Sequence, residues 1–245
     1  MNRILLFAGA GISAESGLAT FREQGGLWTR FDVNEVCNFT VFKRAKNDLA
    51  ARAHIFEFYT LVREAIEKAQ PNDAHRQVAA WQKEFGTERV KVVTANIDDL
   101  FERAGCQDVV HIHGNAKKMH CVACSHTWEA QFYNHEERCP NCSSRLTKPD
   151  VVFFGEPAPE YLKMGQIFND RRRNENDVLL YVGSSQSVIP PYRLIEANRS
   201  HSQTVLVNKD EGPEDRLFRH KYYGLASTGL PLVDNEIIEN FFRKT

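Results

Sequence analysis

Short apolar runs alternate along this chain with longer segments in which apolar residues recur every three or four positions. The short runs have the length and the β-branched content of buried strands, whereas the longer segments have the period of amphipathic helices. Predicted strands span Ile4 to Ala8, Val90 to Thr94, Val109 to His111, Val178 to Val182 and Thr204 to Val207. Strands and helices in alternation are typical of a parallel sheet covered by helices, so we expect an α/β fold.

Two segments depart from this alternation and are predicted to be insertions. Residues 40–85 have helical periodicity, and a long helix is expected to end before Pro71. Residues 116–148 hold four of the six cysteines, and they are too few to form a stable core without a cross-link such as a disulfide or a bound metal ion. We expect a small domain made of these two insertions, hanging from a discontinuous main domain that comprises residues 1–39, 86–115 and 149–245.

The net charge and the length of the apolar runs limit which kinds of binding partner we expect. The 245 residues carry a formal net charge of -1, so no general basic field favours nucleic acid or an anionic membrane as a partner. The first apolar run is shorter than the core of a secretory signal would need, and no window approaches the roughly 20 apolar residues of a membrane span. We expect a cytoplasmic protein without membrane association.

The paired cysteines predict a metal site. Cys121 and Cys124 form one C-x-x-C pair, and Cys139 and Cys142 form a second after fourteen intervening residues. This spacing is close to that of zinc ribbons, in which four thiolates complete a tetrahedron and leave no position for water or substrate. We therefore expect a structural rather than a catalytic Zn²⁺. Zinc ribbons elsewhere also bind nucleic acid, but the chain lacks a basic aromatic face.

A glycine-rich turn follows the first predicted strand. Gly9, Ala10 and Gly11 lie between this strand and an expected helix start, which is the geometry that brings backbone N–H groups to a phosphate. The next glycine, Gly17, does not complete the G-x-G-x-x-G pattern of dinucleotide-binding loops. A tight strand-to-helix turn explains the same residues equally well.

Seven segments together resemble one family. GAGISAESGLATFRE with the later GGLW is similar to the first signature of the sirtuins, which are NAD-dependent protein deacylases. VVTANIDDLFERAG, VVHIHGN and KPDVVFFGE resemble its next three segments, and YVGSSQSVIPP, VLVNKDE and KYYGLAS resemble segments of its last third. The resemblance runs in order from Ile4 to Ser227. It implies a Rossmann-like NAD-binding domain with a smaller domain that carries a zinc ribbon.

The resemblance also implies a reaction. In this family the carbonyl oxygen of an acylated lysine attacks the ribose of NAD, and nicotinamide, the deacylated lysine and O-acyl-ADP-ribose are formed. Such chemistry needs a general base with a pKa near neutrality, which is the usual task of histidine. His113 matches the histidine of the family's His-Gly pair. His111 has the same alternation parity and lies equally near a strand end, so only the resemblance separates the two.

Asn96 and Asp98 follow a predicted strand, where open α/β sheets place ligand-binding side chains. Either residue could instead cap the helix that follows. By resemblance, Asn96 contacts the ribose next to nicotinamide, and Ile97 and Asp98 close the pocket around the carboxamide. Ala95 stands where the family usually has Gln, and loss of that hydrogen bond should weaken NAD binding by about 0.5–1.5 kcal/mol.

The resemblance assigns further residues to NAD. Phe21 would shield the reacting ribose carbon and Arg22 would lie on the cofactor loop, although a core Phe and a surface Arg are the alternatives. Serines after the fourth predicted strand would meet the phosphates and the second ribose, and Ala226 would meet the adenine. The complete set of expected NAD contacts is Gly9, Ala10, Gly11, Ser13, Glu15, Phe21, Arg22, Trp28, Asn96, Ile97, Asp98, Gly183, Ser184, Ser185, Ser187, Asn208, Lys209 and Ala226.

The segment VVFFGE is the expected substrate strand. By strand addition its edge could bind an acyl-lysine peptide through Val152, Phe153, Phe154 and Gly155, although an inner strand is the alternative. Tyr59 and Arg63 are candidates for contacts with the acyl group. Family members that remove acidic acyl groups carry Tyr-x-x-Arg and a small Ala in the cofactor loop.

This chain breaks that acyl-pocket pattern. Val62 stands at the expected Arg position, and Gln24 stands in the loop. Arg63 is one residue late, which turns its side chain by about 100° on a helix. We therefore do not expect a desuccinylase, and an ordinary i,i+4 pair on a helix surface is the alternative for Tyr59 and Arg63.

The expected function is NAD-dependent deacylation of protein lysines, with acylated proteins and NAD as partners. An NAD hydrolase or ADP-ribosyltransferase on the same fold is the closest alternative, and Ala95 motivates it. A non-catalytic NAD-sensing or zinc-ribbon module is a third. The combination of His113, Asn96 and Asp98 argues against that third possibility.

Overall fold

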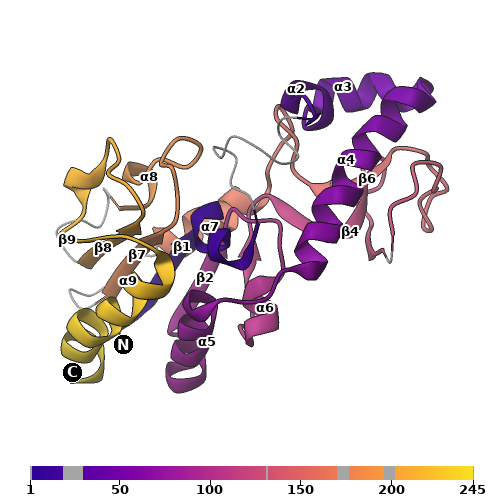
Figure 1. The fold of residues 1–245 in the computed structure, drawn as a ribbon. Helices are drawn as coiled ribbons and strands as arrows, with labels where there is room; N and C mark the ends of the chain where they lie inside the picture. The colour runs from indigo at the N-terminus through magenta and orange to yellow at the C-terminus, as the bar shows by residue number, and fades with distance from the viewer. Residues whose placement is uncertain (1, 19–29, 131, 170–176, 196–201, 245) are drawn as a thin grey trace.

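A computed structural model describes residues 2–18, 30–130, 132–169, 177–195 and 202–244 (Figure 1). The described strands form one sheet of six and one sheet of three. Phe21, Arg22, Gln24 and Trp28, all expected at the cofactor loop, lie outside the described residues.

The larger sheet is parallel throughout and has the order β3-β2-β1-β7-β8-β9. Its strands are β1 (Ile4–Ala8), β2 (Val90–Thr94), β3 (Val110–His111), β7 (Asp177–Val182), β8 (Ser202–Asn208) and β9 (His220–Tyr223). All five predicted strands are confirmed to within two residues at each end, and the edge strand β9 was not predicted. The order reverses direction next to β1, and open α/β sheets bind ligands at such a point.

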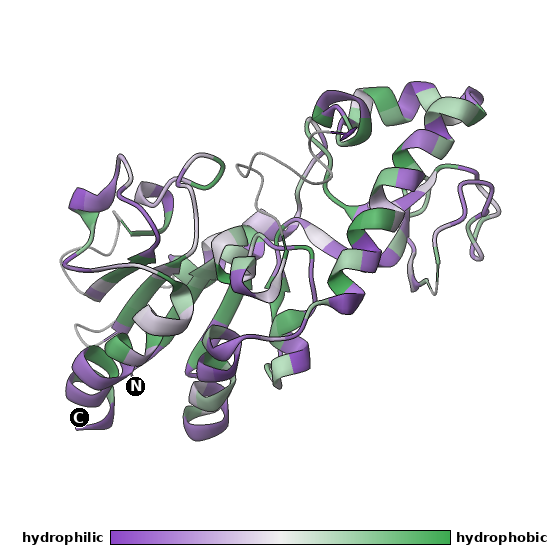
Figure 2. Ribbon diagram, in the orientation of Figure 1, coloured by the Kyte–Doolittle hydropathy of each residue, from purple (hydrophilic) through white to green (hydrophobic). Residues whose placement is uncertain are grey.

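Strand β1 is apolar at every position because both faces of the sheet are covered. Ile4, Leu6 and Ala8 face one hydrophobic core, whereas Leu5 and Phe7 face the other. A strand buried on both sides reads as a continuous apolar run rather than as an alternating one. Figure 2 shows the same contrast, since the strands of this sheet are mostly hydrophobic and the covering helices carry residues of both kinds.

Helices cover the two faces of this sheet. One face packs against α5 (Asp73–Phe85), α6 (Leu100–Ala104), α9 (Ala226–Val233) and the π-helical segment Asp234–Arg243 that continues α9. The other face packs against α7 (Glu160–Phe168) and α8 (Tyr192–Ile195). Short 3-10 turns occupy Ala10–Ile12, Ala14–Ser16, Ala45–Asn47 and Asp215–Leu217. None of the helices in the described parts of the chain combines the length and the hydrophobicity of a membrane span.

The smaller sheet and three helices form a second lobe (Figure 1). Its antiparallel strands are β4 (Gly114–Cys121), β5 (Thr127–Glu129) and β6 (Thr147–Val151), and its helices are α2 (Val33–Val36), α3 (Phe39–Arg44) and α4 (Leu49–Lys68). The buried guanidinium of Arg52 joins α4 to β6, because its Nη2 donates to the carbonyl oxygen and the hydroxyl of Thr147 at 2.7 and 2.8 Å.

Two segments pack across the limits expected for the two domains. Helix α5 lies within residues 40–85 but packs on the large sheet, where Trp81 is fully buried and its indole N–H donates to Asp234 at 2.7 Å. Phe31 and Val36 precede residue 40 but lie in the core of the small lobe. We propose that the small lobe comprises about residues 31–69 and 114–156, and that the remainder forms the large lobe.

Candidate active site and metal centre

The loops after β1 and β7 are held together by their backbones. The amide of Gly9 donates to the carbonyl oxygen of Val182 at 2.9 Å, and that of Gly11 donates to Gly183 at 2.7 Å. A Cβ atom on Gly9 or Gly11 would lie 2.8 Å from backbone atoms of Gly183. These glycines are therefore required by the close approach of the two loops, whatever the loops bind. The helix start expected here consists of two 3-10 turns.

A buried polar cluster lies at the carboxyl ends of β1 and β2. Asn96 donates from Nδ2 to Ser13 Oγ, and Ser13 Oγ donates to Asp98 Oδ2, each at 3.0 Å. The three side chains are 1–7% exposed. Asp98 Oδ1 also accepts the amide of Leu100, the first residue of α6, at 3.1 Å, so Asp98 both contacts the start of this helix and joins the cluster. Burial raises the pKa of Asp98, although the bonds from Leu100 and Ser13 oppose this effect.

The first turn of α5 adds a histidine that sequence reasoning missed. His75 is fully buried, and its Nε2 lies 3.5 Å from Ser13 Oγ. Asn72 caps α5 by accepting the amide of Ala74 at 3.0 Å, and its Nδ2 donates to the carbonyl oxygen of Ile12 at 2.8 Å. The sequence PNDAH carries an N-cap signal that predicts this helix start. It does not indicate that the helix terminus contacts the loop after β1.

The two histidines near the end of β3 have different surroundings. His111 Nδ1 lies 3.0 Å from the carbonyl oxygen of Asn96, and its Nε2 lies 2.7 Å from Glu102 Oε1. Both partners are acceptors, so each ring nitrogen is placed to donate a hydrogen bond. Burial lowers the pKa of His111, but Glu102 and the other acceptors outweigh it and raise the pKa overall. The surroundings of His111 therefore favour its protonated form, in which neither ring nitrogen has a lone pair to accept a proton.

His113 is arranged as a base. Its Nδ1 lies 2.9 Å from the carbonyl oxygen of Ala95, so Nδ1 carries the hydrogen and Nε2 carries the lone pair. Nε2 lies 2.8 Å from the hydroxyl of Tyr161. Burial lowers the pKa of His113, and the bond to Ala95 opposes that effect only in part, so the ring is neutral at pH 7. Geometry therefore separates His113 from His111, which the sequence pattern alone does not do.

Residues expected to contact the adenosine half of NAD lie at the ends of β7 and β8. Asn208 donates from Nδ2 to the carbonyl oxygen of Ser184 at 3.1 Å. Glu15 reaches the start of α9, where its carboxylate accepts the amide and the hydroxyl of Ser227, the residue after Ala226, at 3.1 and 2.5 Å. The side chains of Ser187 and Lys209 are exposed beside these loops.

The segment VVFFGE links the lobes. The amide of Val152 donates to the carbonyl oxygen of His113 at 2.9 Å. Phe154 donates its amide to the carbonyl oxygen of Cys37 at 2.7 Å and accepts the amide of Phe39 at 3.0 Å, so both of its backbone groups are already paired. Phe153 is buried, whereas the side chain of Phe154 is 52% exposed and Gly155 is exposed.

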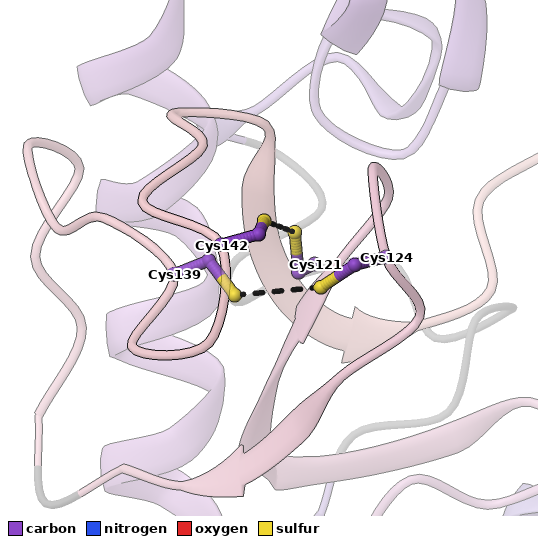
Figure 3. A group of neighbouring side chains, drawn as sticks. All are labelled: Cys121, Cys124, Cys139 and Cys142. Carbon is purple, nitrogen blue, oxygen red and sulfur yellow. Dashed lines mark hydrogen bonds between the residues drawn. The ribbon is translucent and has the colours of Figure 1, made fainter.

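Four sulfur atoms come together in the small lobe (Figure 3). Sγ of Cys121 lies 3.6 Å from that of Cys142, Sγ of Cys124 lies 3.6 Å from that of Cys139, and all four lie within 4.8 Å of one another. A Zn–S distance of about 2.3 Å requires tetrahedral S···S separations of about 3.8 Å. The four cysteines therefore fit a single tetrahedral zinc ion.

Comparison with known proteins decides the family. The family model described as "SIR2: Sir2 family" matches residues 9–190. This chain belongs to the Sir2 family. An NAD-dependent protein deacylase of Helicobacter hepaticus is 33% identical to it, over 99% of each chain. The NAD-dependent protein deacylase 2 of Archaeoglobus fulgidus is 35% identical, over 95% of this chain and 90% of that protein.

Solved structures of Sir2 proteins agree with the fold. A Sir2 homologue in complex with NAD has a TM-score of 0.80 at 28% identity, with 98% of this chain and 90% of that one covered. A Sir2 protein with a deacetylated p53 peptide and 3'-O-acetyl ADP-ribose has a TM-score of 0.73 at 27% identity, with 96% and 93% covered. The α/β fold and the resemblance to the sirtuins are thus confirmed.

Within this Sir2 chain, the two acyl-group candidates lie in the core of the small lobe. Tyr59 is 2% exposed, and its hydroxyl donates to Cys37 Sγ at 3.3 Å while its ring stacks on Phe153. Arg63 is 8% exposed, donates to Glu67 and to the carbonyl oxygen of Lys117, and lies over the ring of Tyr133. Neither residue forms the exposed helix-surface pair that was considered as an alternative.

Proposed function

We propose that this chain is an NAD-dependent protein-lysine deacylase that transfers an acyl group from lysine to ADP-ribose and releases nicotinamide. The neutral, partly buried His113 with its Nε2 lone pair carries this proposal, because it is the base that the reaction requires. Membership of the Sir2 family and 33% identity to an NAD-dependent protein deacylase over 99% of each chain support it.

We assign proton removal to His113. When bound, NAD supplies the ribose that receives the acyl group and the bond to nicotinamide that breaks. Nε2 of His113 takes the proton of a ribose hydroxyl, while Nδ1–H stays bonded to the carbonyl oxygen of Ala95 and fixes the plane of the ring. A lowered pKa keeps the lone pair available at neutral pH.

The polar cluster is the proposed binding site for the nicotinamide half of NAD. Ser13, Asn96 and Asp98 are buried polar groups at the carboxyl edge of a parallel sheet, next to the point where strand order reverses. Their mutual hydrogen bonds fix each side chain before a ligand arrives, which limits the entropy lost on binding. The loops after β7 and β8 and the start of α9 are proposed to hold the adenosine half.

The four cysteines are proposed to hold one structural zinc ion. The two C-x-x-C turns share one geometry, because Ser125 and Ser143 each adopt a φ of 58° and each donate an amide to the first cysteine of the pair at 2.8 Å. A complete set of four thiolates has no place for a reactant. The ion would stabilise the long connection between β4 and β6.

An acylated peptide is the proposed second substrate. It would lie along Val152–Gly155 and enter from the exposed side of Phe154. The backbone of Phe154 is already paired with Cys37 and Phe39, and the amide of Val152 is paired with His113. The main-chain bonds of the peptide are therefore assigned to the carbonyl oxygen of Val152 and to Gly155. We also propose a cytoplasmic location, since cysteines arranged for a metal ion suit a reducing compartment.

One assay tests the function. The protein is incubated with NAD and with acetyl-, longer acyl- and succinyl-lysine peptides, and the products are identified by mass. We expect O-acyl-ADP-ribose, nicotinamide and deacylated peptide in equal amounts, formed only when peptide is present. ADP-ribose formed without peptide would instead show NAD hydrolysis, and ADP-ribosylated protein would show a transferase; Ala95 motivates both of these alternatives.

Two histidine variants test the assignment of the base. His113→Ala should lower deacylation by about 10²–10⁴-fold, because it removes the proton acceptor. His111→Gln removes a ring whose surroundings favour the protonated form, and this variant should keep the reaction. Deacylation that survives in His113→Ala would show that another group removes the proton.

A further inference from the structure

The hydroxyl of Tyr161 forms a hydrogen bond with the reactive nitrogen of the proposed base. It lies in the first turn of α7, and its hydroxyl oxygen is 2.8 Å from His113 Nε2. The two ring centroids are 5.8 Å apart at an interplanar angle of 45°, so the contact is made through the hydroxyl rather than by ring stacking. Nothing in the proposed reaction requires a tyrosine at this position.

The direction of this hydrogen bond is fixed by the other side of the ring. Nδ1 of His113 faces the carbonyl oxygen of Ala95, which can only accept, so the single hydrogen of the neutral ring is on Nδ1. Nε2 therefore has a lone pair, and the hydroxyl of Tyr161 must be the donor. Burial raises the pKa of Tyr161, and although the charge of Arg193 opposes this, the hydroxyl keeps its hydrogen at neutral pH.

An imidazole nitrogen has one lone pair in the plane of its ring. While Tyr161 donates to it, a ribose hydroxyl cannot donate to the same lone pair and cannot lose its proton there. The base is thus covered before the cofactor binds. Tyr161 is partly exposed at the surface of α7, so its hydroxyl can exchange His113 for water without leaving a buried polar group unpaired.

We propose that Tyr161 is a positioning residue that caps Nε2 of His113 in the cofactor-free enzyme and is displaced by the hydroxyl of the ribose when NAD binds. The proposal rests on the proposed function, since it concerns the base of that reaction. The cap keeps the imidazole in the Nδ1–H tautomer with Nε2 directed away from Ala95. NAD binding then includes the loss of one hydrogen bond.

The hydrogen bond itself is tested in the protein without NAD. The side-chain ¹⁵N resonances of His113 are recorded across pH in the wild type and in Tyr161→Phe, and are assigned with His113→Gln. We expect the Nε2 resonance to move in Tyr161→Phe. The pKa of His113 should rise in this variant, because a donor to the lone pair stabilises the neutral ring.

The control is Tyr222→Phe, because the hydroxyl of Tyr222 donates to Glu236 at 2.8 Å and has no contact with His113. This variant should leave both His113 signals unchanged. Within the described residues, the carbonyl oxygen of Ala95 and the charge of Arg193 on α8 act on this pair, and all the variants retain them. An unchanged Nε2 resonance in Tyr161→Phe would overturn the proposal.

Displacement is tested by calorimetry with NAD alone. Loss of the competing donor should tighten NAD binding about three- to tenfold in Tyr161→Phe, which corresponds to one neutral hydrogen bond. The same substitution in a His113→Gln background should have no such effect, because the coupling between the two side chains is then absent. Equal or weaker NAD binding by Tyr161→Phe would overturn the displacement.

These measurements are independent of peptide turnover. If the wild type forms no O-acyl-ADP-ribose with any peptide, the proposed function fails, while the resonance shift and the NAD affinities still decide whether Tyr161 is a cap. If deacylation proceeds but kcat falls in Tyr161→Phe, the hydroxyl takes part in the chemistry and the capping role is wrong.

Discussion

The amide of Gly11 donates to the carbonyl oxygen of Gly183 across 2.7 Å, which joins the loop after the first strand to a loop that begins 172 residues later. The two strands before these loops are direct neighbours in the sheet. The loops approach so closely that a Cβ atom on Gly183 would lie 2.4 Å from the backbone nitrogen of Ile12. The floor of the proposed cofactor site is therefore set by backbone contact.

Gly183→Ala should destabilise the protein strongly. The residue has a φ of +60° and no space for a Cβ atom, so strain and steric clash act together and should cost about 2–4 kcal/mol in the free energy of unfolding. Gly17→Ala is the matched control, because Gly17 has a φ of +85° but nothing within 4 Å of an added Cβ atom. It should cost only about 1 kcal/mol. Urea denaturation measures both, and equal losses would show that the close approach is unimportant.

His75 should make the protein acid-sensitive. Burial lowers its pKa to about 4 in the folded state, whereas an unfolded histidine titrates near 6.5. As the pH falls below about 6.5, the histidine of the unfolded chain binds a proton and that of the folded chain does not. The free energy of unfolding therefore decreases progressively down to about pH 4. Between pH 7 and pH 5 this amounts to about 2 kcal/mol.

Unfolding curves at pH 7 and pH 5 check this effect. The difference between the two pH values should shrink in His75→Gln by about the amount that His75 contributes. It should persist in His54→Gln, which removes a partly exposed histidine. A His75→Gln protein that keeps the full pH dependence would assign it to other groups.

Loss of one of the four clustered cysteines should abolish zinc binding. We expect one zinc ion per chain by elemental analysis, and its loss in Cys139→Ser, because Cys139 is 2% exposed and its sulfur lies 3.6 Å from that of Cys124. Cys106→Ser is the control, since Cys106 lies in the core of the large lobe. It should keep the zinc even if the melting temperature falls. Full zinc content in Cys139→Ser would contradict the four-cysteine site.

The sequence predicts the large sheet well because its strands are continuous apolar runs. Residues such as Leu5 and Leu6 are buried on opposite faces, and this is a local signal that needs no tertiary information. The lobe boundaries are less predictable. Helix α5 follows α4 in the sequence, but the burial of Val78 and Trp81 against the large sheet depends on how the chain turns after residue 69.

The chemistry of the site was only partly accessible from the sequence. The proposed roles of His111 and His113 depend on contacts with Glu102 and Ala95, which belong to other elements of the fold, so alternation along one strand cannot separate them. Tyr161 was missed for the same reason, since it is on a helix 48 residues beyond His113. Helical periodicity shows that a residue is near a surface but does not identify its partner.

His113 lies in the segment of backbone that joins the large sheet to the small sheet. On one side of it the amide of Ile112 donates to Thr94 in the large lobe, and on the other its own carbonyl oxygen accepts the amide of Val152 beside the small sheet. The next residue, Gly114, adopts a φ of +83°. The backbone that carries the imidazole is therefore one of the connections between the two lobes. The proposed base and this connection are parts of the same few residues, so a shift of one lobe against the other would reach the imidazole through the backbone.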